Sequence, residues 1–403
     1  MLTGEIIQLD KKYYMDTFGD RTPIVFTEGK GSTLYDTNGK AYTDFLAGIA
    51  VNSLGYNHPK LTEAIINQAG KLLHCSNIFY IEAQAQLAKL LVENSCGNKV
   101  FFCNSGAEAN EGAIKLVRKY FSKQGMNKYE ILSADNSFHG RTLATIAATG
   151  QEKYQKPFKP MPVGFKHIPY NNLAAAKEAV TENTAAILIE VIQGEGGVIE
   201  GTIEYIQGLQ KLCRLKGLLL IVDEVQTGIG RTGKLFGYEH YNIEPDIFTL
   251  AKGLGGGVPI GAIVAKGDAA EVFEPGDHGS TFGGNPLACS AGLAVLSTVL
   301  EKDFLKSCAE KGNLFKEGLS RLKEKFQFIK DVRGQGLILG MELDEKTSGK
   351  VIVKKVLNKG FIINCAGHNT LRFVPPLIIQ ENEIQRLLST LHEIFLEESL
   401  VVK

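Results

Sequence analysis

Six short apolar runs constrain the fold of this chain more than any other feature. They are KVFFCNSG, YEILSAD, AAILIEVI, LLLIVDEV, DIFTLAK and GAIVAK, all between residues 99 and 266. The apolar part of each run lacks polar alternation, which is typical of strands buried on both faces. Helical patterns separate several runs, among them residues 203–217, where Gly217 is a plausible C-cap. The pattern predicts an α/β fold with a mainly parallel mixed sheet between helices.

The pattern of charged and apolar residues changes after residue 297. Residues 298–403 contain charged helical stretches between short strands, which predicts a small α+β domain. Residues 51–297 hold all six apolar runs and are expected to form the large, ligand-binding domain. Residues 1–50 are expected to pack with the small domain. A length of 403 residues agrees with two or three domains.

Bulk composition excludes several classes of function. Lys+Arg and Asp+Glu both number 44, so no basic surface for nucleic acid or an anionic membrane is expected. Seven scattered cysteines without a Cys-x-x-Cys pair argue against disulfides and for a reducing compartment. The N-terminus does not resemble a signal peptide, and no apolar stretch reaches the roughly 20 residues of a membrane span. A cytoplasmic protein is the expectation.

Two of the apolar runs end in ionisable side chains, a carboxylate and an amine, that can take part in a reaction. Asp223 follows LLLIV, and Lys252 follows DIFTLA and precedes GLGGG. Ligands of open α/β sheets bind at the carboxyl ends of strands. A carboxylate there can keep a pyridine nitrogen protonated, and a partly desolvated lysine can form a Schiff base with an aldehyde. A helix cap or ion pair for Asp223, and a surface position for Lys252, are the competing structural interpretations.

A candidate phosphate site lies at the start of the helix after the first run. Ser105, Gly106 and Ala107 precede an apolar stripe at three- and four-residue spacing. Free amide groups at a helix N-terminus bind phosphate. A serine that only caps the helix gives the same pattern, and for this motif alone that interpretation is favoured.

Two further motifs are interpreted as structural. Arg333–Leu337, RGQGL, resembles a dinucleotide fingerprint only faintly, because its glycine spacing is wrong, and a tight turn between strands is expected. His139 and His278 lack metal-ligand spacing to any other His or Cys, so no metal site is expected.

The ordered motifs together resemble the class III, ornithine-type aminotransferases, which are pyridoxal-phosphate enzymes of fold type I. The resemblance runs almost from end to end. Its segments are FLAGIAVNSLGYNHPKL, NSGAEANEGAIKLVRKY, SFHGRTLAT, IQGEGGV, LIVDEVQTGIGRTG, AKGLGGGVPIGA, GSTFGGNPLA and LRFVPPL, in the family's order.

The resemblance implies a role for each cofactor-binding residue. Lys252 would form the Schiff base with pyridoxal phosphate and shuttle the proton, and Asp223 would hold the ring nitrogen. The ring would lie between Val225 and Phe138, with Gln226 on its hydroxyl. The phosphate would be bound by Ser105, Gly106 and Ala107, and by Thr281 from the partner subunit of a homodimer with shared active sites.

The resemblance also implies how two substrates share one site in a ping-pong transamination. Arg141 would bind the α-carboxylate of the amino donor, and Ser280 would contact substrate. Arg372 would bind the α-carboxylate of glutamate or 2-oxoglutarate, since a planar guanidinium takes a carboxylate bidentately. Glu195 would neutralise Arg372 while the amino donor is bound and swing away for the dicarboxylate.

The identity of the donor depends on few residues. Ornithine δ-aminotransferases typically have a tyrosine where this chain has Ile49, so Ile49 favours an acylated ornithine, although it is also explained by packing alone. N-acetylornithine is favoured over succinylornithine, and both are favoured over GABA or free ornithine. Overlap with an acylated diaminopimelate precursor stays open.

Two other classes of function stay open at the level of the sequence. A pyridoxal-phosphate aminomutase or decarboxylase of the same group is disfavoured by the presence of both Arg372 and Glu195. A catalytically silent relative is disfavoured by the presence of Lys252 and Asp223.

Overall fold

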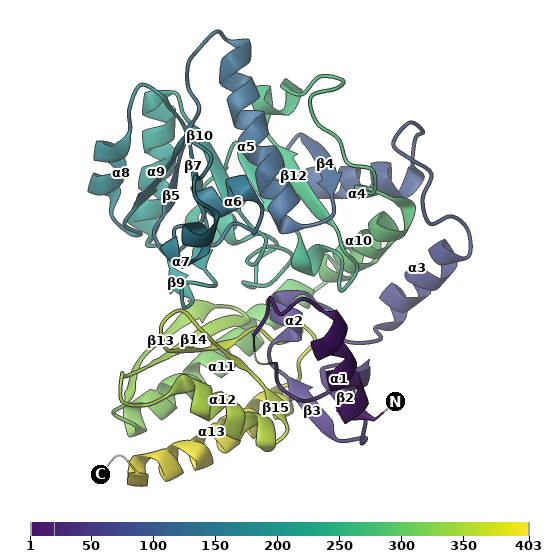
Figure 1. Ribbon diagram of the computed structural model, residues 1–403, viewed down its shortest axis with the longest axis vertical. Helices are drawn as coiled ribbons and strands as arrows, with labels where there is room; N and C mark the ends of the chain where they lie inside the picture. Colours follow the sequence, from purple (N-terminus) through teal and green to yellow (C-terminus); the bar gives the residue numbers. More distant parts are fainter. Residues whose placement is uncertain (1, 20, 402–403) are drawn as a thin grey trace.

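A seven-stranded sheet forms the centre of the molecule. The computed structural model describes residues 2–19 and 21–401 (Figure 1). The strands in spatial order are β4 (Lys99–Cys103), β12 (Gly261–Ala265), β11 (Ile247–Leu250), β10 (Leu219–Asp223), β7 (Thr184–Ile189), β5 (Glu130–Ala134) and β6 (Phe165–Ile168). β12 is antiparallel to both of its neighbours, and the other pairs are parallel. The predicted α/β fold with a mainly parallel mixed sheet is confirmed.

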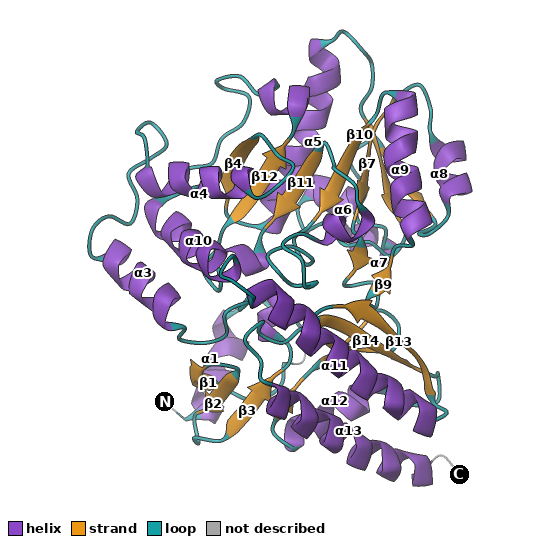
Figure 2. Ribbon diagram, turned by 180° about the vertical axis from the view of Figure 1, so that it is seen from behind, coloured by secondary structure: helices purple, strands orange, loops and turns teal. Residues whose placement is uncertain are grey.

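Helices cover both faces of this sheet, because its strands bury side chains in both directions. α5 (Gly106–Lys123) contributes Ala113 and Val117 to the core on one face, where they join Ile221 of β10. α9 (Ile203–Lys216) and α10 (Pro286–Val299) lie on the opposite face, as Figure 2 shows, over Val222 and Phe248. The shorter helices of this part are α3 (Pro59–Ala69), which packs against α10, α4 (Glu82–Glu93), α6 (Leu143–Ala148), α7 (Glu152–Gln155) and α8 (Leu173–Ala179).

The C-terminal part contains a second sheet backed by long helices. Its strands in spatial order are β13 (Ile329–Gln335), β14 (Ile338–Leu343), β17 (Thr370–Phe373) and β16 (Asn364–Ala366), all antiparallel. Its helices are α11 (Phe304–Lys325), α12 (Gly349–Asn358) and α13 (Glu381–Val401). The RGQGL motif ends β13 and turns into β14, as predicted, with Gly336 at φ 55°.

The N-terminal segment shares a sheet with the C-terminal part. α1 (Thr3–Tyr13) precedes β1 (Phe26–Lys30), β2 (Thr33–Asp36), β3 (Ala41–Asp44) and the short α2 (Ala47–Ala50). β3 pairs in parallel with β15 (Phe361–Ile362), so the N-terminal segment and the C-terminal part together form the lower lobe of Figure 1. The division at residues 50/51 and 297/298 stays a prediction. Within the described residues, no helix is long and apolar enough to cross a membrane.

Candidate active site

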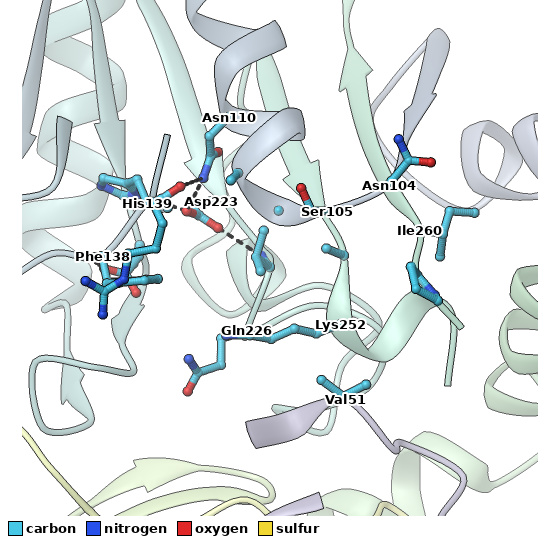
Figure 3. A pocket seen from close by; sticks show the side chains of 18 of the residues that line it. Val51, Asn104, Ser105, Asn110, Phe138, His139, Asp223, Gln226, Lys252 and Ile260 are labelled. Carbon is cyan, nitrogen blue, oxygen red and sulfur yellow. Dashed lines mark hydrogen bonds and ion pairs between the residues drawn. The ribbon is translucent and has the colours of Figure 1, made fainter. Parts of the chain in front are cut away.

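A cavity of about 390 Å³ opens at the carboxyl ends of the central strands. Asp223 is the last residue of β10, and Lys252 comes two residues after the end of β11. The N-terminus of α5 and the loop after β5 supply further walls (Figure 3). The cavity lining thus includes these predicted site residues: Ser105, Gly106, Ala107, Phe138, Arg141, Asp223, Val225, Gln226 and Lys252.

Asp223 is a buried carboxylate held by donors from three directions. Its Oδ2 accepts from Nδ2 of Asn110 and from Nδ1 of His139, both at 2.8 Å. Its Oδ1 accepts from the backbone N–H of Val225 at 3.0 Å. Such donors offset the desolvation of a carboxylate that is only 4% exposed. Hydrogen bonds therefore hold this carboxylate in place, and Asp223 still lines the cavity (Figure 3).

Lys252 lies half-buried at the start of a 3-10 turn, Lys252–Leu254. Burial lowers the pKa of its amine, although the negative charge of Glu195 opposes this shift. Its φ of 43° is unusual for a residue with a side chain, and such backbone strain is concentrated at functional sites. A lysine with a lowered pKa is available as a nucleophile at lower pH than an exposed one.

At the N-terminus of α5, the helix is capped by Ser105 and its backbone lies close to Val225. Oγ of Ser105 accepts from the backbone N–H of Glu108 at 3.2 Å, so Ser105 is the N-cap. The first amide groups of a helix have no acceptor within it and remain free for an anion. A Cβ on Gly106 would come within 2.9 Å of Cγ1 of Val225, so the tight packing requires glycine here. The cap and phosphate-site interpretations are thus compatible.

An ion pair lies beside the cavity and joins two parts of the chain. Glu195 lies in the loop between β8 (Ile192–Gln193) and β9 (Ile199–Glu200), and Arg372 lies in β17. Nη1 of Arg372 donates to Oε1 of Glu195 at 2.6 Å and to Oε1 of Gln226 at 3.2 Å. Burial favours a higher pKa for Glu195, but the guanidinium of Arg372 outweighs this and lowers that pKa. Arg372 is 0% exposed, so removing Glu195 would leave a buried, unpaired cation.

Arg141 and Phe138 form part of an aromatic wall. The guanidinium of Arg141 lies 3.9 Å from the ring centroid of Tyr154 and 5.4 Å from that of Phe138. Phe138 meets Tyr154 edge-on at 6.0 Å. Arg141 is exposed, so its charge stays accessible to a ligand in the cavity.

Besides Glu195 and Arg372, three further predicted residues lie outside the cavity walls. Oγ of Ser280 accepts from Nδ2 of Asn104, a lining residue, at 3.1 Å. Thr281 is exposed at the surface next to it. Ile49 lies in α2 with φ 66° and is 37% exposed, two residues before Val51, which does line the cavity.

Sequence reasoning missed five polar residues in or behind this site. They are Asn104, Asn110, His139, Glu190 and Thr249, of which His139 was weighed only as a metal ligand. Glu190 follows β7 as Asp223 ends β10, so the position of a carboxylate at the end of an apolar run could have revealed it. Burial raises the pKa of Glu190 to about 7. Among the described residues, no group of three or more His, Cys, Asp or Glu side chains could hold a metal ion.

The arrangement fits a phosphorylated pyridine aldehyde. A buried carboxylate, a lysine with a lowered pKa and a helix N-terminus share one cavity, and Val225 and Phe138 supply apolar faces for a ring. Its polar groups are thus of the kinds that would hold the cationic nitrogen, the aldehyde and the phosphate of pyridoxal phosphate.

The fold and this site are those of an aminotransferase. The family model described as aminotransferase class-III matches residues 14–395, and the chain belongs to this family.

Relatives with similar sequences share one name. An acetylornithine aminotransferase of Caldanaerobacter subterraneus subsp. tengcongensis is 56% identical over 97% of this chain and 99% of its own length. One from Methanocaldococcus jannaschii is 54% identical over 97% of this chain and 98% of its own.

Solved structures agree in fold. The ornithine aminotransferase of Toxoplasma gondii superposes with a TM-score of 0.94 at 33% identity, over 99% of this chain and 96% of that one. The N-acetylornithine aminotransferase of Stenotrophomonas maltophilia superposes with a TM-score of 0.84 at 35% identity, over 98% of this chain and 100% of that one.

Proposed function

We propose that this class III aminotransferase carries pyridoxal phosphate on Lys252 and transfers the δ-amino group of N-acetylornithine to 2-oxoglutarate. The products are N-acetylglutamate semialdehyde and glutamate, and the reaction belongs to arginine biosynthesis in the cytoplasm. The observation that carries the choice of donor is the full-length similarity to relatives that share this name, at 56% and 54% identity.

The proposed chemistry assigns a task to each part of the site. The bound cofactor supplies an electron sink for the carbon that loses its proton. Asp223 holds the ring nitrogen protonated, and the N-terminus of α5 binds the phosphate. Lys252 would hold the aldehyde of the cofactor and would act as the base that takes the proton from the terminal carbon of the donor, a task that suits an amine with a lowered pKa.

The Glu195–Arg372 pair supports the exchange of two unlike substrates. With Glu195 paired to it, Arg372 is neutralised, and the cavity accepts a donor whose reacting carbon carries no carboxylate. When 2-oxoglutarate enters, Glu195 moves aside and Arg372 binds the free carboxylate bidentately. Arg141 binds the remaining carboxylate of either substrate.

Free ornithine is the second candidate donor, because the Toxoplasma gondii ornithine aminotransferase is so similar in structure, at a TM-score of 0.94. Its sequence is less similar, at 33% identity. Ile49 also disfavours ornithine, since an apolar side chain offers no hydrogen bond to a second free amine. A comparison of donors in the first half-reaction separates the two candidates.

A homodimer with shared active sites completes the proposal. Thr281 is exposed and lies outside the cavity walls, as expected for a residue that reaches the phosphate of the partner subunit. Ile78, Phe79 and Tyr80 are exposed apolar or aromatic side chains in the loop between α3 and α4. Contiguous apolar surface of this kind marks an interface.

A further inference from the structure

Asn110 links three elements that meet behind Asp223. It lies in the second turn of α5 and is 1% exposed. Its Nδ2 donates both to Oδ2 of Asp223 and to the backbone carbonyl of His139, each at 2.8 Å. Its Oδ1 accepts from Oγ1 of Thr249 in β11 at 2.8 Å. The side-chain amide therefore uses both of its ends, and Figure 3 shows it pointing at Asp223.

Two acceptors fix the orientation of this amide, and Thr249 supports it. A flipped amide would set its oxygen against the carboxylate of Asp223 and the backbone carbonyl of His139, neither of which can donate. It would also lose the hydrogen bond that the buried hydroxyl of Thr249, in β11, donates to Oδ1. Thr249 thus adds to the preference for Nδ2 directed at Oδ2 of Asp223.

The consequence concerns the other oxygen of Asp223. Asn110 and His139 occupy Oδ2, and the backbone of Val225 sets the position of Oδ1. We propose that Asn110, supported by Thr249, is a positioning residue that keeps the Asp223 carboxylate aimed at the place of the ring nitrogen of the cofactor. It also ties that carboxylate to α5, whose N-terminus would bind the phosphate, so one helix would set the distance between the two anchors of the ring.

This inference rests on pyridoxal phosphate as the cofactor. It predicts which contact of the cofactor is weakened when Asn110 is replaced. Loss of the Asn110 amide should weaken contacts to the ring nitrogen and spare those to the phosphate. An analogue of pyridoxal phosphate with carbon in place of the ring nitrogen has no such contact to lose. Affinities for both compounds, measured by titrating the cofactor-free protein, therefore separate positioning from general disruption.

The variants are Asn110→Ala and the shape-conserving Thr249→Val, which removes only the hydroxyl. For Asn110→Ala we expect roughly tenfold weaker binding of pyridoxal phosphate but a change within about twofold for the analogue, because one hydrogen bond to a charged group is lost. Thr249→Val should change the two affinities in the same pattern, by less. In Asn110→Ala, the NMR signal of a labelled ring nitrogen should move from its protonated toward its unprotonated position.

Glu108→Ala is the matched control on the same helix. The Glu108 carboxylate accepts from the backbone N–H of Asn104 and from Oγ of Ser105, so its loss loosens the N-terminus of α5 without touching Asp223. It should weaken binding of both compounds equally. If Asn110→Ala weakens the binding of both compounds equally, or of neither, the positioning role alone is overturned. A wild-type protein that binds neither compound would overturn the proposed cofactor together with this role.

Discussion

At the scale of single residues, the amine of Lys252 decides how the protein captures its cofactor. Burial lowers its pKa below the ordinary lysine value of 10.5, so the free-base fraction rises at lower pH than for an exposed lysine. When cofactor-free protein is mixed with pyridoxal phosphate, the rate of Schiff-base formation should rise with pH and level off below 10.5. Absorbance after rapid mixing at a series of pH values measures it.

The control for this capture experiment is Lys252→Ala. This variant should retain the cofactor non-covalently, since the phosphate and ring contacts remain, but it should show no Schiff-base absorbance and no turnover. A wild-type capture rate that keeps rising through pH 10.5 would show that the amine has an ordinary pKa and that burial does not activate it.

The residues at strand ends were predictable, and those behind them were not. Asp223 and Lys252 could be singled out because a charged side chain directly after a buried strand must meet a partner at the edge of the sheet. Asn110 and Thr249 lie inside a helix and a strand, where a single polar residue gives no signal of its own. Only the packing of α5 against β11 reveals their hydrogen bond.

At the scale of elements, the strands with uninterrupted apolar runs could be predicted from the sequence, and the strand interrupted by polar residues could not. Six uninterrupted apolar runs became β4, β5, β7, β10, β11 and β12. β6 was missed, because it is an edge strand in which Lys166 and His167 interrupt the apolar pattern. The left-handed residues of α2, including Ile49 at φ 66°, were also unpredictable, since a β-branched residue rarely adopts this conformation.

The N-terminus of α5 is the element that tests the phosphate site. Gly106→Ala would push its methyl group into Val225 and move that side chain toward the ring. We expect binding of pyridoxal phosphate about tenfold weaker or worse, since overpacking of a tight site is costly. Gly4→Ala is the control, because the added methyl group meets nothing within 4 Å there. Equal affinity in the two variants would contradict the tight packing of Gly106 against Val225 at the cofactor site.

At the scale of the whole molecule, the loop between α3 and α4 tests the shared active site. Tyr80→Asp places a charge in the proposed interface, where Tyr80 is fully exposed in the single chain. We expect monomers in analytical ultracentrifugation and loss of activity, because Thr281 would no longer reach a partner's phosphate. Leu215→Asp, an equally drastic change at an exposed position in α9, should leave the oligomeric state and the activity unchanged. An active monomer would contradict shared active sites.

The central claim is the identity of the amino donor, and the first half-reaction measures it directly. The protein loaded with pyridoxal phosphate is mixed with N-acetylornithine, succinylornithine, ornithine or GABA, in the absence of any keto acid. Loss of the visible absorbance of the cofactor is followed against donor concentration. We predict the highest specificity constant for N-acetylornithine. A higher value for ornithine or GABA would leave the family and the cofactor standing but would contradict the proposed donor and the interpretation of Ile49.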